Sequence, residues 1–110
     1  ARDLISRYVW IVDTLSRYER LTREELNRLW VRSHLSDGNP LPERTFYHYR
    51  RAIEENFHLD IACDSSGRYY LDMDNSRQSR AFTNWMLDSY AVSSAIKEAN
   101  APVSYTHLTL

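Results

Sequence analysis

The spacing of apolar residues predicts three helices in the first half of the chain. Across residues 4–18, apolar side chains recur every three or four positions and share one side of a helix. The same spacing continues from 21 to about 33, where Thr22 as N-cap and Glu25 three residues later form a capping box. A turn-rich connection leads to a third helix at 42–57, which begins with a proline suited to a first helical turn.

The predicted helix at 42–57 has two chemically different faces. Phe46 and Ile53 fall on one side of the helical wheel, which favours burial of that side. The acids Glu54 and Glu55 lie in the last turns, so cations dominate nearer the start. The outward side and its margins carry Arg44, Thr45, Tyr47, His48, Arg50 and Arg51. Such a face could enter a DNA major groove with its N-terminal half leading, or it could be the solvated face of an ordinary core helix.

Two short alternating segments after the third helix predict a β-hairpin. Residues 59–63 and 68–73 alternate with a period of two, and a Gly-containing turn at 64–67 joins them. Cys63 falls on the inward side of the first strand and is expected to be a small core residue. Arg68 is expected near the hairpin tip, where it either reaches phosphate or a minor groove or remains a solvated turn arginine. Three helices followed by a hairpin predict a winged helix-turn-helix, a mainly α fold with a small β-hairpin.

A fourth helix is predicted from residue 76 to about 90, beyond the winged helix. Its Phe82, Trp85 and Met86 cluster on one broad apolar face that needs a partner. Trp10 points away from the apolar side of the first helix and is expected to join the same surface. We expect this surface to pair two chains as a homodimer. The alternatives are that a later segment of the chain covers Trp10 and that the fourth helix packs on the first.

These assignments divide the chain into three regions. Residues 1–74 form the predicted DNA-binding winged helix-turn-helix, and residues 75–99 form a linker or dimerisation helix. Residues 100–110 are expected to be a disordered tail. The sequence of the tail resembles translated sequencing-adapter DNA, which would make it a truncation artefact without an evolved role.

Composition and charge narrow the function. The chain has 110 residues and a net charge of −1, so a nucleic-acid role depends on where the charges lie. Lys97 is the one lysine among 14 basic residues, and arginine suits bidentate contacts to phosphate or guanine. Neither the four histidines nor the single cysteine has metal-ligand spacing, and two glycines cannot build a phosphate-cradling loop. We therefore expect no enzyme activity and no cofactor.

Residues 44–46 (RTF), followed by an aromatic and basic helix, resemble the recognition helix of a known family. That family is the bacterial WYL-domain transcriptional regulators, in the versions of Bacteroides-type bacteria, whose first domain is a DeoR-like winged helix. The preceding LTREELNRLW and the hairpin that follows support the likeness, which covers most of the chain. Residues 47–49 (YHY) replace the arginine pair and aspartate usual in the family, so roles carry over only to Arg44 and Thr45.

The resemblance implies sequence-specific binding to double-stranded DNA as the N-terminal part of a transcriptional regulator, with 42–57 in the major groove. It also implies a ligand-sensing WYL domain in a full-length form. The alternative function is a winged-helix module for protein interaction or dimerisation without DNA binding. No apolar run approaches the ~18 residues that cross a bilayer, and the lone Cys63 suits a reducing compartment. We expect a cytoplasmic protein at the bacterial nucleoid.

Overall fold

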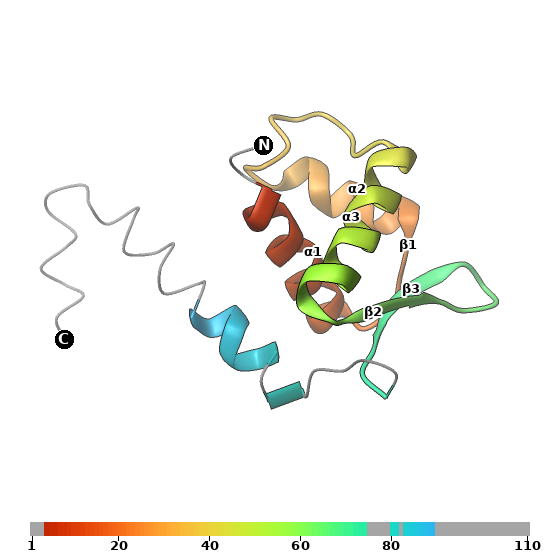
Figure 1. The fold of residues 1–110 in the computed structure, drawn as a ribbon. Helices are drawn as coiled ribbons and strands as arrows, with labels where there is room; N and C mark the ends of the chain where they lie inside the picture. Colours follow the sequence, from red (N-terminus) through yellow and green to blue (C-terminus); the bar gives the residue numbers. More distant parts are fainter. Residues whose placement is uncertain (1–3, 75–79, 82, 90–110) are drawn as a thin grey trace, which may run out of the picture. The chain divides into compact units, whose positions relative to one another are not determined.

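The computed structural model describes residues 4–74, 80–81 and 83–89 (Figure 1). The chain divides into two compact units, Ala1–Ser79 and Arg80–Leu110. The described part of the first unit contains, in chain order, α1 (Leu4–Tyr18), β1 (Leu21–Thr22), α2 (Arg23–Arg32), α3 (Glu43–Phe57), β2 (Asp60–Cys63) and β3 (Arg68–Asp72). This mainly helical unit with a small antiparallel sheet is compatible with a winged helix.

The first two helices begin and end close to where the apolar spacing predicts them. α1 spans the predicted residues, with Ile11 and Val12 fully buried. α2 begins at Arg23, directly after the predicted N-cap. Thr22 Oγ1 accepts from the Glu25 N–H at 3.1 Å, and Glu25 Oε1 accepts from the Thr22 N–H at 2.9 Å. The capping box is confirmed, and the bond from the Thr22 N–H lowers the pKa of the Glu25 carboxyl.

α3 starts one residue later than predicted because Pro42 occupies the N-cap position. Pro42 has extended backbone, and its carbonyl accepts the first helical hydrogen bond from the Phe46 N–H at 2.9 Å. The helix ends at Phe57, and the C-cap residue His58 has a left-handed φ of 59°. The His58 N–H donates to the Glu54 carbonyl at 3.0 Å, which satisfies one of the last carbonyl groups.

A three-stranded antiparallel sheet in the order β1-β3-β2 is present where the sequence predicted two strands. β2 and β3 pair as predicted, from Asp60 opposite Asp72 to Cys63 opposite Tyr69. The additional strand β1 places Leu21 opposite Tyr69. Two residues are too few to show an alternating pattern, so sequence spacing missed this strand. The third strand supports a hairpin that two strands alone would leave marginal, and Figure 1 shows the hairpin turn extending away from the helices.

Aromatic rings join α3 to α1 and to the sheet. The Phe46 ring meets the Tyr69 ring edge-on, with 4.9 Å between centroids, and so connects α3 with β3. On the other side, the Tyr8 ring of α1 meets the Tyr49 ring at 5.5 Å. Arg7 Nη1 donates to Tyr49 Oη at 2.7 Å. These contacts set the rotation of α3 about its own axis, because edge-to-face ring pairs depend on geometry as well as on buried area.

The structure corrects one sequence prediction about a single side chain and distinguishes two alternatives for another. Cys63 is exposed rather than a small core residue, because it is the last residue of β2 and lies beside the hairpin turn. Trp10 is half-buried, because its ring packs edge-on against Trp30 of α2 at 5.3 Å. A later segment of the chain, α2, therefore covers part of Trp10, as one of the two alternatives predicted.

The second unit is described at residues 80–81 and 83–89, which are helical and lie within the predicted fourth helix. Trp85 is 62% exposed, and Met86 is half-buried. No described helix is long and apolar enough to cross a membrane. Four predicted features lie outside the described residues, namely the start of the linker helix at 75–79, Phe82, the end of that helix at 90–99 and the tail at 100–110.

Candidate nucleic-acid interface

Packing of α3 on the core turns its basic face outward. Phe46 and Ile53 have no exposed surface, and Tyr49 is buried beside them, which confirms the predicted inward face. Burying each large apolar side chain contributes roughly 1.5–3 kcal/mol, so rotation of the helix would be costly. Arg44 and His48 lie on the opposite side of the helical wheel and are exposed.

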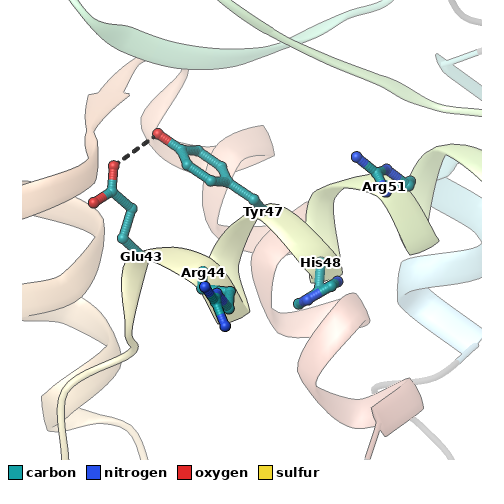
Figure 2. Close-up of a pocket in the computed structure, with 5 residues that line it drawn as sticks. All are labelled: Glu43, Arg44, Tyr47, His48 and Arg51. Atoms are coloured by element: carbon teal, nitrogen blue, oxygen red, sulfur yellow. Dashed lines mark hydrogen bonds between the residues drawn. The ribbon is translucent and has the colours of Figure 1, made fainter.

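An open depression of about 370 Å³ lies along the outward side of α3 (Figure 2). Its lining consists of Glu43, Arg44, Tyr47, His48 and Arg51. Four of these five are predicted DNA-binding residues, so the structure brings those four together. Figure 2 shows Glu43 and Tyr47 turned toward each other, whereas Arg44 and His48 project away from that pair.

Three basic side chains of the depression have no intramolecular partner in the described part of the chain. Arg44, His48 and Arg51 are exposed, and none of them makes a hydrogen bond or an ion pair there. An unpaired arginine keeps all five N–H donors available. Its planar fork suits a phosphate or the O6 and N7 atoms of guanine. The depression therefore offers donors spaced about one helical turn apart.

The other two predicted contacts on α3 lie outside the depression. Thr45 is half-buried in the first turn. Arg50 is also half-buried, and its Nε donates to the Ile61 carbonyl at 2.8 Å. The Arg50 guanidinium carbon lies 5.2 Å from the centre of the Tyr69 ring. Arg50 thus joins α3 to the hairpin, which explains its place at the boundary between the two faces of the helix.

Glu43 belongs to the depression, although the sequence did not single it out. Tyr47 Oη donates to Glu43 Oε2 at 3.0 Å. Burial, together with a side-chain hydrogen bond to Tyr47, raises the pKa of Tyr69 to about 12. Tyr47 thus contacts Glu43 and affects the ionisation of Tyr69 in β3. An acid in the first turn of a helix commonly stabilises the helix, so the position of Glu43 alone does not indicate a binding role. Its four-residue spacing from Tyr47 does predict that the two side chains can make contact.

Arginines at the hairpin are paired, unlike those of the depression. Asp64 Oδ1 accepts from the N–H and hydroxyl of Ser66, at 3.0 and 2.8 Å, and from the Arg68 N–H at 2.9 Å. Asp64 Oδ2 lies 3.0 Å from Arg20 Nη1 and 3.4 Å from Arg68 Nε. The bonds from Arg68 and Ser66 hold the pKa of Asp64 well below its usual range. The predicted wing residue Arg68 is therefore exposed but engaged with the turn.

Hydrogen-bond donors are the main chemical groups that this face of α3 presents. In the described ranges, no group of three or more His, Cys, Asp or Glu residues could hold a metal ion. Comparison of the chain with models of known protein families, with curated proteins and with solved structures gave no match. Hydrogen-bond donors on one face of an exposed helix can contact phosphates and base edges.

Proposed function

We propose that this chain binds double-stranded DNA sequence-specifically, with α3 in the major groove. The observation that carries this function is the set of unpaired Arg44, His48 and Arg51 side chains on the outward face of α3. The major groove of B-DNA admits an α-helix, and arginine pairs there with guanine O6 and N7. The exposed acids Glu54 and Glu55 lie near the far end of the helix, which favours entry with the N-terminal half leading.

The residues of the interface have different roles in the proposed complex. Arg44, in the first turn, pairs with a guanine, because the N-terminal residues of a recognition helix reach base edges. His48, one turn later, donates to guanine or to phosphate. Arg51 contacts a phosphate, as does Thr45 near the helix N-terminus. The remaining three predicted contacts already have intramolecular partners: Tyr47, Arg50 and Arg68.

The binding serves transcription regulation in this proposal. The chain is the N-terminal part of a bacterial WYL-domain regulator acting at the nucleoid, where a separate domain senses a ligand. Support comes from the likeness of residues 44–46 and of LTREELNRLW to that family, and from a fold compatible with a winged helix. The chain acts as a binding module rather than an enzyme and needs no cofactor.

Two copies of the chain bind together, in keeping with the two-fold symmetry of many bacterial operators. Trp85 carries this part of the proposal, because an aromatic side chain that is 62% exposed suits a partner surface. Met86, half-buried in the same helix, contributes. Sedimentation at micromolar concentration should show a dimer that Trp85→Asp converts to a monomer. A monomeric parent would rule the dimer out.

The exposure of Trp85 also favours a second function, a winged-helix protein-interaction module without DNA binding. Salt dependence separates the two functions. Contacts to phosphate release counterions, so the logarithm of the DNA affinity should fall with the logarithm of salt concentration, with a slope of about −0.9 per phosphate contact. The measurement is fluorescence anisotropy of the chain with a mixed pool of duplexes. A slope indistinguishable from zero would leave the interaction module as the better function.

A further inference from the structure

One carboxylate lies among the basic side chains of the depression. Glu43 precedes Arg44 at the start of α3, and its side chain is exposed. It forms no ion pair with any described residue. Its Oε2 atom accepts the hydrogen bond from Tyr47 at 3.0 Å (Figure 2), and its Oε1 atom has no partner within the described ranges. This carboxylate therefore retains an oxygen that can accept a hydrogen bond from a ligand.

A carboxylate at this position opposes non-specific DNA binding, because phosphates carry the same charge. The major groove offers a group that complements it, the exocyclic N4 amine of cytosine. The first turn of a recognition helix is the part that reaches base edges. The phosphate backbone of any DNA repels this carboxylate, whereas only cytosine attracts it. The carboxylate therefore favours sequences that present cytosine at that position.

We propose that Glu43 is a specificity-determining residue that accepts a hydrogen bond from cytosine N4, next to the guanine contact of Arg44. The inference rests on the proposed DNA binding and adds a base preference to it. The ligand is a duplex with a cytosine at one fixed position in the major groove. Arginine contacts alone would favour guanine, so a cytosine preference distinguishes Glu43 from its neighbours.

Tyr47 acts as the positioning residue for this carboxylate. Its hydroxyl holds Oε2 of Glu43, so Oε1 is left to face a base. The Tyr47 ring is supported in turn by the Phe46 ring, with 5.8 Å between centroids. Holding the Glu43 side chain in advance reduces the conformational entropy that base contact would otherwise cost.

The test is selection of bound sequences from duplex DNA with a randomised central segment. The parent should prefer cytosine at one position by about tenfold or more. Glu43→Gln has a single side-chain oxygen. With that oxygen accepting from Tyr47, the NH2 group faces the base, where it can donate to a purine N7 but cannot accept from cytosine N4. This variant should therefore exchange the cytosine preference for a purine preference at the same position and leave the other positions unchanged. Glu43→Ala should lose the preference there and bind duplexes without the site about threefold more tightly.

Two further variants control for charge and for positioning. Glu54→Gln removes the same charge from the other end of α3 and should leave every base preference unchanged. Tyr47→Phe should keep the cytosine preference but weaken it about threefold. If Glu43→Gln has the parent's base preferences at every position, the inference fails while DNA binding stands, and Glu43 is an ordinary first-turn acid. If the parent shows no salt-dependent binding to duplexes, both the inference and the proposed function fail.

Discussion

The outward face of α3 and the turn of the hairpin both present arginines, but of these arginines only those at the hairpin form ion pairs with described residues. On α3, Arg44 and Arg51 have no hydrogen-bond or ion-pair partner in the part of the chain that the structure describes. At the hairpin, Arg20 and Arg68 share the carboxylate of Asp64, with N–O distances of 3.0 and 3.4 Å. Arg20 also lies over the Tyr70 ring, 3.8 Å from its centre.

In the proposed complex, the placement of the countercharge matters more than the number of arginines. A paired arginine must give up its partner before it contacts a phosphate, which offsets much of the gain. An unpaired arginine only replaces water and salt ions, and the release of DNA counterions then favours binding. We therefore expect DNA affinity to depend on α3 and the conformation of the hairpin turn to depend on Asp64.

Arg44→Ala should have the largest effect on binding. It removes the proposed guanine contact, so it should cost ~1–3 kcal/mol on the preferred site and flatten the preference at one base pair. A panel of duplexes with single-base substitutions measures both quantities. Arg51→Ala is the matched control on the same face and should weaken all duplexes alike. A uniform loss for Arg44→Ala would make Arg44 a phosphate anchor.

Asp64→Asn should affect folding stability more than DNA binding. Hydrogen bonds from Arg68 and Ser66 lower the pKa of Asp64, so its ionised form stabilises the folded chain above the ordinary Asp pKa of about 4. This contribution is lost as the pH falls through the folded-state pKa. The variant should have a lower Tm than the parent at neutral pH, and the difference should shrink below about pH 4. Thermal melts across this pH range measure it, and a pH-independent difference would rule out the charge of Asp64 as the cause.

Arg68→Ala should have the smallest effect on DNA. Because the Arg68 guanidinium is engaged with Asp64 and Ser66, its removal should change affinity for the preferred duplex by less than about twofold. Titration of parent and variant at the same salt concentration makes the comparison. A loss as large as that of Arg44→Ala would show that the hairpin contacts DNA and that the two regions do not differ as proposed.

Local patterns in the sequence predicted most of the fold. Three-to-four-residue spacing gave the bounds of α1, and the Thr22–Glu25 pair marked the start of α2. Period-two alternation located the hairpin. By contrast, β1 is defined by its pairing with β3, which is remote in sequence. Cys63 is exposed because β2 ends there beside the turn, whereas period-two alternation assumes that the strand stays covered to its last residue.

The sequence predicted which residues of the candidate site face outward, but it did not predict which of them are paired. The helical wheel identified the outward position of Arg44, His48 and Arg51, because it depends only on which side of α3 is apolar. Whether an arginine is paired depends on tertiary contacts. The bond from Arg50 to the Ile61 carbonyl forms only because the hairpin returns beside α3. The edge contact of Trp10 with a ring of α2 is a further tertiary contact that the spacing of α1 could not reveal.

The most direct test compares the salt dependence of DNA binding for one variant from each region. Arg51→Ala removes an unpaired arginine from α3, and the double variant Arg20→Ala/Arg68→Ala removes both arginines paired with Asp64. The measured quantity is the slope of the logarithm of affinity against the logarithm of salt concentration. Arg51→Ala should reduce the size of this slope by about one, and the double variant should leave the slope unchanged. A reduced slope for the double variant with an unchanged slope for Arg51→Ala would contradict the assignment of DNA binding to α3.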